Sequence, residues 1–447
     1  MTATSPPTTR TRVPPAWTAQ LVLGAVLLAH LTIVEVQFFS TGTGKNSILT
    51  VAKFFGLHAA SIMMLQLILI ARLPWLDRRL GMDRLTRWHR WIGFTLFWTV
   101  LTHATLVVLG YTALGPEPFF GTFLALAGVV ASLLGMLAAA VMLVVVASSL
   151  RWVRRRISYE TWHALHFALY LTITLALIHQ LLEGTTFAAT PLAIGHWWTV
   201  WALVLIALLV GRVIVPLRRN AHHRFRVAAV VPESDNVVSV HVTGRNLERL
   251  PAQAGQFCIW RFPGHNPWWQ ANPFSLSAAP DGRSMRLTAK GVGTTSAGLR
   301  HLPVGNRVFV EGPYGAFTRL HQVTDSTLLI AGGVGVTPIR AMLEESSGST
   351  VVLYRVSSPA DAVLLNELQQ LAQERGAQLH VLTGRTGSGN PPLAPFDPPQ
   401  LSALVPDITQ RDVYVCGPPA MTNAVLRSLR ALNVPRAQVH AERFSLA

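Results

Sequence analysis

The chain has 447 residues, of which 50% are hydrophobic and only 13% are charged, and its formal net charge is +16. Soluble domains carry about 25% charged residues, so this composition excludes an ordinary soluble enzyme. Long apolar runs fill the first half, whereas the second half alternates short apolar runs with Gly and Pro turns. We therefore expect a membrane half followed by a soluble half.

The positive charge lies in the gaps between apolar runs and does not form one basic face, which argues against a nucleic-acid partner. The cysteines Cys258 and Cys416 both fall in the soluble half. Two distant cysteines exclude a disulfide framework and a Cys-based metal cluster, and they indicate a reducing compartment.

Six runs have the length of about 20 residues that one membrane crossing needs. They lie roughly at Trp17 to Phe39, Val51 to Leu73, Trp91 to Tyr111, Phe119 to Ser149, Thr161 to Leu182 and Trp197 to Val215. The first run could instead be a cleaved signal sequence, but it is long for one and no small-residue cleavage site precedes Phe39.

Arginines crowd alternate junctions between these runs, and the other junctions carry little beyond Lys45 and Lys53. The Arg-rich junctions contain Arg72, Arg78, Arg79, Arg84, Arg87, Arg90, Arg151, Arg154, Arg155, Arg156, Arg212, Arg218 and Arg219. The positive-inside rule then puts the N-terminus and the soluble half in the cytoplasm. The short loops near Thr41, Gly115 and Thr185 would face outside.

Two spans contain paired histidines, and ionisable residues inside a membrane are costly enough to suggest a function. His89 and His103 in the third span are 14 residues apart, close to four helical turns, so both imidazoles share a face about 21 Å apart. His166 and His179 in the fifth span are 13 residues apart, which requires a local helix irregularity to align them. His163 is the second choice for His166.

Because the third and fifth spans both start at an Arg-rich junction and run in the same direction, His89 pairs with His166 near the cytoplasm and His103 pairs with His179 near the outside. Two such pairs predict two haems, each held by two imidazoles and suited to electron transfer. A single membrane histidine is more often a hydrogen-bonding group, and we read His30 in that way.

His58 also lacks partner spacing and receives the same structural interpretation. Arg87 and Arg90 inside and Lys53 outside could neutralise haem propionates. They could equally be interfacial anchors.

The soluble half begins with short alternating runs that predict an antiparallel barrel. These runs are Arg224 to Val231, Val237 to Thr243, Gln256 to Phe262, Ser284 to Lys290 and Arg307 to Glu311. From Ser326 the pattern becomes strand, Gly-rich turn, helix and strand, which indicates a nucleotide-binding α/β domain. The predicted domains are residues 1–16, a cytoplasmic tail; 17–217, the membrane domain; 218–320, the barrel; and 321–447, the α/β domain.

Three motifs carry chemistry in this half, and each alone is a weak signal because a Gly-rich turn is often only a turn. The first combines Asn272, Pro273, Phe274, Ser275 and Ser277 with Lys290, Gly293 and Ser296, whose hydroxyls, ammonium and backbone could hold a pyrophosphate. The second contains Gly332, Gly333, Gly335, Thr337 and Pro338, where backbone could approach a dinucleotide. The third, Cys416, Gly417 and Pro418, would border the nicotinamide.

Together these residues resemble the ferric reductase and NADPH oxidase superfamily over nearly the whole chain. The resemblance implies an all-α, six-helix transmembrane haem domain followed by a ferredoxin–NADP reductase-like module, in which an antiparallel β-barrel binds FAD and an α/β domain binds NAD(P)H. It maps the family's four haem histidines onto His89, His103, His166 and His179. Asn272 replaces the usual His of the flavin motif. Phe444 is similar to the family's terminal aromatic residue, which lies against the flavin, although three residues follow it here.

The resemblance implies an oxidoreductase of a bacterial-type inner or plasma membrane. Electrons would pass from cytoplasmic NAD(P)H through FAD and two b-type haems to an external acceptor, with Phe444 and Cys416 beside the reacting rings. O₂ giving superoxide is favoured because the outer loops hold no acidic or His cluster for iron; a ferric chelate or a partner protein are alternatives. A membrane-anchored flavin reductase without haem is the competing class. Arg355 and Arg385 favour NADPH over NADH, although exposed loop arginines would look the same.

Overall fold

The computed structural model describes residues 16–157, 159–183, 186–187, 189–265, 270, 272–384, 387 and 394–443. The chain divides into two compact units. The membrane unit contains Trp17–Leu73 and Arg84–Val213, and the soluble unit contains Pro74–Asp83 and Ile214–Ala447. The short segment Pro74–Asp83 therefore belongs with the soluble unit, although sequence analysis placed it inside the membrane domain.

Among the described residues, six helical stretches are long and apolar enough to cross a membrane, which confirms the expected multi-pass architecture. They are Trp17–Ser40, Ser47–Ile70, Arg84–Thr112, Val130–Ser149, Thr161–Leu182 and Pro191–His223. Most of their surface is apolar and exposed, as expected for helices that face lipid.

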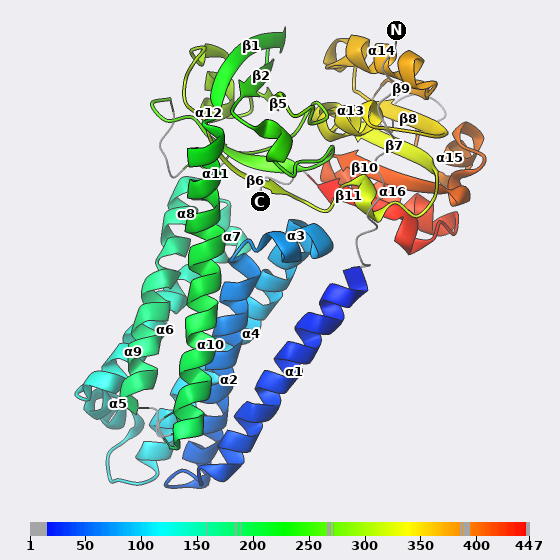
Figure 1. Cartoon of the computed structure of the whole chain (residues 1–447). Helices are drawn as coiled ribbons and strands as arrows, with labels where there is room; N and C mark the ends of the chain where they lie inside the picture. Colours follow the sequence, from blue (N-terminus) through cyan, green and yellow to red (C-terminus); the bar gives the residue numbers. More distant parts are fainter. Residues whose placement is uncertain are drawn as a thin grey trace. The chain divides into compact units, whose positions relative to one another are not determined.

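The membrane unit consists of helices (Figure 1). These are α1 (Ala16–Ser40), α2 (Ser47–Ile70), α4 (Met82–Thr112), α5 (Phe119–Ala127), α6 (Val130–Ser149), α7 (Arg151–Arg154), α8 (Tyr159–Phe167), α9 (Leu169–Glu183), α10 (Pro191–Leu209) and the π-helical turn η1 (Val210–Ile214).

Several predicted span boundaries differ from the structure, and two of the differences have a local cause. The fourth span starts at Val130 and not at Phe119, because the extended backbone of Val129 separates α5 from α6. The sixth starts at Pro191 and not at Trp197, because Thr190 caps α10 by accepting a hydrogen bond from the Ala193 amide at 3.1 Å. A capping Thr followed by Pro at the first helical position is a strong helix start.

The fifth span contains the irregularity that the 13-residue spacing required. Helix α8 ends at Phe167 and α9 begins at Leu169. At the junction the Ala168 amide bonds to the Leu165 carbonyl at 3.0 Å, three residues back, which tightens the helix locally. The break falls between His166 and His179 and changes the rotation of one relative to the other.

The first part of the soluble unit is a closed barrel of six antiparallel strands. The strands are β1 (Arg226–Ser234), β2 (Val237–Thr243), β3 (Phe257–Arg261), β4 (Asn272–Ser275), β5 (Ser284–Lys290) and β6 (Phe309–Tyr314). They form two sheets, β1-β2-β5 and β4-β3-β6, that are joined by isolated bridges at Leu276 with Leu287 and at Arg226 with Arg307. Apolar side chains from both sheets, including Trp260 and Leu287, fill one core.

The second part is a five-stranded sheet in the order β11-β10-β7-β8-β9, in which every neighbouring pair is parallel. Its strands are β7 (Ser326–Gly332), β8 (Thr350–Arg355), β9 (Gln378–Leu382), β10 (Arg411–Gly417) and β11 (Val439–Arg443). The helices of the soluble unit are α3 (Pro74–Leu80), α11 (Val215–His223), α12 (Thr294–Gly298), α13 (Val336–Glu344), α14 (Leu365–Arg375), α15 (Pro398–Leu404) and α16 (Pro419–Ala431). This barrel and α/β sheet confirm the predicted fold class.

The barrel and the sheet share a hydrophobic cluster and are packed together. Ala254 and Phe317 lie in the same cluster as Tyr354, Tyr414 and Cys416 of the sheet. The barrel and the parallel sheet are thereby held against each other by apolar burial.

Candidate functional site

Two glycine-rich turns meet at the carboxyl edge of the parallel sheet, where β7 and β10 end side by side. From β7 the chain continues to β8 on one side, whereas β10 lies on the other, so the strand order changes direction here. In open α/β sheets such a switch point is where ligands bind. The sequence motifs at Gly332 to Pro338 and Cys416 to Pro418 occupy this position.

The close approach of the two turns explains their glycines. A Cβ added to Gly335 would lie 2.4 Å from the Cys416 carbonyl oxygen, and one added to Gly417 would lie 3.1 Å from the Gly332 Cα. Gly333 has a φ of +52° and open space at its Cβ position. The edge therefore presents bare backbone to an approaching ligand.

The other predicted residues of these turns support the edge from within. The Thr337 hydroxyl donates a hydrogen bond to the Val334 carbonyl at 3.1 Å, and both Thr337 and Pro338 are buried in α13. Cys416 is also fully buried. Arg355 ends β8 in register with Gly332 and donates to the Leu382 carbonyl at 3.2 Å. Arg385, the other predicted phosphate ligand, lies outside the described residues.

The predicted flavin motif forms strand β4, which pairs with β3 in the barrel. Ser275 is 2% exposed, and among the described residues no hydrogen-bond partner meets its hydroxyl. Pro273 and Phe274 are less buried than Ser275. A buried hydroxyl without a protein partner fits a site that a bound polar group completes.

The second part of that motif is a loop held by one serine. The Ser296 hydroxyl accepts hydrogen bonds from the amides of Val292 and Gly293 at 3.0 and 3.2 Å. Lys290 is exposed at the end of β5, and nothing lies within 4 Å of a Cβ added to Gly293. The loop offers a positive charge beside open backbone, which suits a phosphate group.

Ser277 of the same motif is fully buried, and its hydroxyl accepts from Thr288 Oγ1 at 2.7 Å and from Arg286 Nε at 3.1 Å. Its contact with a flavin stays a prediction. Phe444, the predicted aromatic partner of the flavin, lies outside the described residues.

The four span histidines come together in two pairs inside the membrane unit. The ring centroids of His89 and His166 are 6.2 Å apart, and those of His103 and His179 are 6.4 Å apart. A metal–imidazole bond is about 2 Å long, so two rings bound end-on to opposite faces of one iron have centroids about 6 Å apart. Both pairs fit this separation.

Backbone carbonyls orient the rings of His103 and His179. His103 Nδ1 donates to the Ala52 carbonyl of α2 at 2.8 Å, and His179 Nδ1 donates to the Ala131 carbonyl of α6 at 2.8 Å. A carbonyl accepts only, so Nδ1 carries the hydrogen and Nε2 keeps its lone pair. Metal-binding histidines characteristically have their second nitrogen held in this way.

Three residues around these pairs were not found by sequence analysis. Gly56 and Gly135 leave room for the outer rings, since a Cβ on Gly56 would lie 2.8 Å from His103 Cε1 and one on Gly135 would lie 3.0 Å from His179 Nδ1. Trp162 stacks on His166 with centroids 5.1 Å apart. The His166 ring faces the His89 ring at 6.2 Å, which favours His166 over His163.

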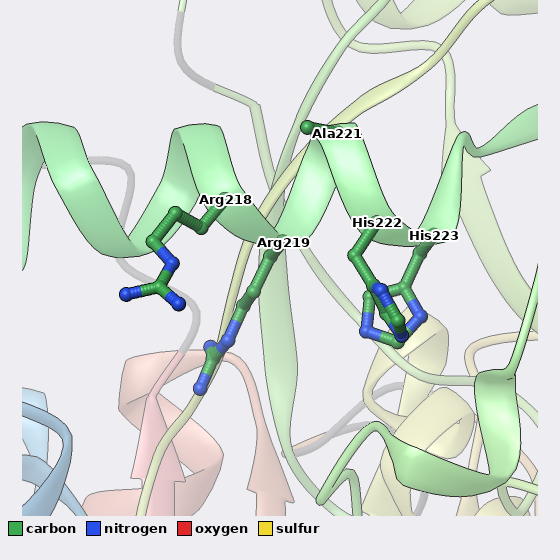
Figure 2. A pocket seen from close by; sticks show the side chains of 5 residues that line it. All are labelled: Arg218, Arg219, Ala221, His222 and His223. Carbon is green, nitrogen blue, oxygen red and sulfur yellow. The ribbon is translucent and has the colours of Figure 1, made fainter.

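A basic hollow of about 530 Å³ lies along α11 and is lined by Arg218, Arg219, Ala221, His222 and His223 (Figure 2). Arg218 and Arg219 point away from the helix on the same side, and Arg219 donates a hydrogen bond to the Gly312 carbonyl. None of the nucleotide or histidine motifs lines this hollow.

Comparison with protein families matches three successive parts of the chain. Residues 55–177 match a ferric reductase like transmembrane component, residues 222–318 an FAD-binding domain, and residues 329–427 an oxidoreductase NAD-binding domain.

The relatives match about half of the chain. The ferredoxin reductase component of 3-ketosteroid-9-alpha-monooxygenase from Mycobacterium tuberculosis is 30% identical over 49% of this chain and 64% of its own length. A flavohemoprotein from Vibrio cholerae is 30% identical over 44% of this chain and 52% of its own length. The chain thus spans less than two thirds of each relative.

Among solved structures, the flavohem-like FAD/NAD binding domain of nitric oxide dioxygenase from Vibrio cholerae is 27% identical with a TM-score of 0.41, covering 50% of this chain and 98% of that domain. A ferredoxin reductase in carbazole 1,9a-dioxygenase is 24% identical with a TM-score of 0.41, covering 50% of this chain and 69% of its own. From the three successive domain matches and the observed fold, the chain has the ferric reductase and NADPH oxidase-like architecture, a ferric-reductase-like transmembrane component joined to oxidoreductase FAD- and NAD-binding domains.

Proposed function

We propose that this protein is a transmembrane oxidoreductase that moves electrons from cytoplasmic NAD(P)H through FAD and two b-type haems to an acceptor outside. One observation carries the proposal. Two pairs of imidazoles, with ring centroids 6.2 and 6.4 Å apart, lie in a unit whose helices are long enough to cross a membrane. Four polar side chains in two matched pairs are costly in a membrane unless they bind something.

His89 and His166 would hold the haem nearer the cytoplasm, and His103 and His179 would hold the outer one. When bound, FAD takes the two electrons of a hydride and a haem iron takes one, so the flavin joins the two kinds of carrier. Ala52 and Ala131 keep the outer imidazoles in the tautomer that leaves Nε2 free. Two imidazoles on each iron would favour electron transfer over binding of a small ligand there.

In the soluble unit the residues divide between two nucleotides. The turns at Gly332, Gly335 and Gly417 would receive the NAD(P)H pyrophosphate and nicotinamide, with Cys416 and Phe444 beside the reacting rings. Asn272, Pro273, Phe274, Ser275, Lys290, Gly293 and Ser296 would hold FAD.

Arg355 and Arg385 would meet the 2′-phosphate of NADPH. Rates of flavin reduction with the two cofactors test this preference, and faster reduction by NADH would remove it.

O₂, reduced to superoxide, is the acceptor that we propose. The short connections at residues 41–46 and 113–118 hold no cluster of acidic or histidine side chains that would bind ferric iron. A ferric chelate is a second candidate. The relatives named as reductase components of monooxygenases favour a third, delivery to a partner protein. Superoxide yield per electron separates O₂ from the other two.

The proposal is tested by the visible spectrum of detergent-purified protein before and after NADPH under nitrogen. We expect reduced b-type bands in the wild type and loss of about half the haem in His103→Ala, because one of two paired sites is removed. His163→Ala is the matched control and keeps both haems. Absence of haem bands from the wild type would leave a membrane-anchored flavin reductase.

A further inference from the structure

The membrane unit contains a second group of ionisable side chains, separate from the two imidazole pairs. His30 and Glu35 come from α1, His58 from α2 and His196 from α10. Sequence analysis assigned His30 and His58 no partner because their partners lie on other helices. In the structure the rings of His30 and His196 are stacked with centroids 5.2 Å apart, and His58 Nε2 lies 3.1 Å from Glu35 Oε1.

The Glu35 carboxyl and the His58 imidazole are placed to pass on a proton. His58 Nδ1 lies 2.9 Å from the Phe54 carbonyl, which accepts only, so this nitrogen is the donor in that contact. A hydrogen at the contact between His58 Nε2 and Glu35 Oε1, 3.1 Å apart, would be shared by the two side chains.

His30 is the complementary acceptor. The Ser61 hydroxyl lies 3.1 Å from the Leu57 carbonyl, to which it can donate, and 3.0 Å from His30 Nε2, from which it can accept. In the tautomer that satisfies both contacts, a neutral His30 carries its hydrogen on Nε2 and a lone pair on Nδ1. His30 Nδ1 and His196 Nε2 are both buried, and among the described residues neither meets a hydrogen-bond partner.

The surroundings of this group contribute little other charge. On α2, Lys53 is turned to the Thr41 hydroxyl at 2.8 Å and the Gly42 carbonyl at 3.1 Å. The side chains from α4 and α9 in the adjoining core, Leu96, Ile173, Ala176 and Leu177, are apolar. On α10, Trp197 donates to Gln37 Oε1 of α1 at 2.8 Å and joins the two helices without a titratable group. Glu35, whose side chain is 37% exposed, is the polar entry to the group.

We propose that Glu35, His58, His30 and His196 form a proton-uptake site that balances the charge of electrons entering the membrane unit. The inference rests on the proposed function, because the electrons are those delivered from NAD(P)H. A buried negative charge in a low-dielectric interior is costly, and a proton bound nearby offsets it.

Atoms and charge are conserved in the proposed step. One electron enters the membrane unit, and one proton leaves water outside and enters through Glu35 and His58. A new N–H bond forms at His30 Nδ1 or His196 Nε2, and one O–H bond of the donor water or hydronium is broken. The site itself is neither oxidised nor reduced.

The test is a potentiometric titration of the haem bands of the purified full chain at a series of pH values. Proton uptake on reduction makes reduction harder as pH rises, so a midpoint potential should fall with pH. If one proton is bound per electron, a tenfold fall in proton concentration shifts the reduction equilibrium tenfold. The midpoint potential then falls by about 59 mV per pH unit. We expect a slope between zero and this limit in the wild type.

His30→Gln keeps a hydrogen-bond donor for Ser61 but binds no proton, and Glu35→Gln removes the entry carboxyl. Both should flatten the slope while haem content stays constant. Trp197→Phe breaks the bond to Gln37 without removing a titratable group and should retain the slope. A pH-independent wild-type potential, or equal flattening in Trp197→Phe, overturns the inference and leaves the proposed function standing. A protein without haem bands overturns the proposed function and this inference with it.

Discussion

Two alanines and two glycines set the position of the His103 and His179 rings. On α2 the carbonyl of Ala52 and the bare Cα of Gly56 are four residues apart, and on α6 Ala131 and Gly135 repeat the same spacing. Four residues is about one helical turn, so each carbonyl and its glycine lie on one face of the helix, next to one imidazole ring. The same arrangement, which we call the ring seat, occurs on two different helices.

A methyl group added at Gly56 or Gly135 should displace the neighbouring imidazole and cause the loss of one haem. In Gly56→Ala the new Cβ would lie 2.8 Å from His103 Cε1, and in Gly135→Ala it would lie 3.0 Å from His179 Nδ1. We expect each variant to lose about half of its haem, because an imidazole displaced from its seat loses the bond that orients it. Haem per protein, measured from the reduced bands, checks this.

Gly24→Ala is the control for these two variants, since nothing lies within 4 Å of its added Cβ and it also sits in a membrane helix. It should keep its full haem content. Full haem in Gly56→Ala would show that the ring can move without losing its ligand role.

The histidines were predictable from the chain, and their seats were not. Spacing along one helix is visible in sequence, so His89 and His103 could be assigned to one face. The glycines that receive the rings lie on other helices, and their role depends on which helices touch. Likewise His30 and His196 are 166 positions apart in the chain and become neighbours only through the packing of α1 against α10.

At the scale of elements, the junction between α8 and α9 is a helix irregularity whose existence, but not whose position, the histidine spacing predicts. A continuous helix would place His166 and His179 on different faces, and the spacing alone correctly indicates that some irregularity is needed. Its position at Ala168, and its form as a tightened turn, depend on local hydrogen bonds. No Gly or Pro marks the spot, so the sequence carries no signal for it.

The edge formed by β7 and β10 gives a prediction for hydride transfer. Gly335→Ala would place a Cβ 2.4 Å from the Cys416 carbonyl oxygen, which is fixed backbone, so the two turns must separate. We expect flavin reduction by NADPH to slow at least about tenfold, since small misplacements at a reacting site are costly. Anaerobic stopped-flow absorbance measures the rate.

FAD content and reduction by dithionite should be unchanged in the same variant, because the barrel is not altered. Loss of FAD together with the rate would mean that the substitution damages the whole soluble unit and not the nucleotide edge.

At the scale of the whole molecule, an ion-pair network ties the barrel to the sheet. Arg286 of β5 makes two hydrogen bonds to the Glu367 carboxylate of α14, at 2.8 and 2.9 Å. Arg340 of α13 pairs with the same carboxylate at 2.9 Å and also with Glu344, which accepts from the Ala279 amide. The network crosses between the two nucleotide-binding parts and helps to fix their spacing.

This network should make the soluble unit sensitive to acid. Burial alone would raise the pKa of Glu367, but hydrogen bonds from Arg286 and the charges of Arg286 and Arg340 outweigh it, so the pKa lies below its ordinary value. A depressed pKa gives stability that is present above the unfolded pKa, near 4.3, and is lost as pH falls through the folded value. Thermal unfolding followed by flavin fluorescence from pH 7 downward measures it.

Glu367→Gln should lower the stability of the soluble unit at pH 7 by about 1 kcal/mol, a figure reduced from that of a buried charged bond because the side chain is 36% exposed. The variant should also lose less stability than the wild type as the pH falls. An identical pH dependence in both proteins would show that Glu367 does not supply it.

The sequence indicated the order of the parts, the number of spans and the two kinds of nucleotide motif, because each depends on local pattern. It did not indicate that Pro74–Asp83, a link between two spans, belongs to the soluble unit. That assignment follows from contacts with residues more than 200 positions later. Asp77 Oδ2 accepts from the Gly315 amide at 2.8 Å, and His321 Nε2 donates to the Arg78 carbonyl at 3.0 Å.

A protein whose second half includes a piece of its first half cannot be divided by one cut. Excision after Val213 would remove α3 from the soluble unit and leave the Gly315 amide without its carboxylate partner. A shortened chain meant to yield the dehydrogenase alone should therefore carry residues 74–83, joined by a linker or added as a peptide. For the same reason, replacing this half by that of a soluble reductase would leave residues 74–83 without their contacts at Gly315 and His321, so this loop should be exchanged together with the soluble half.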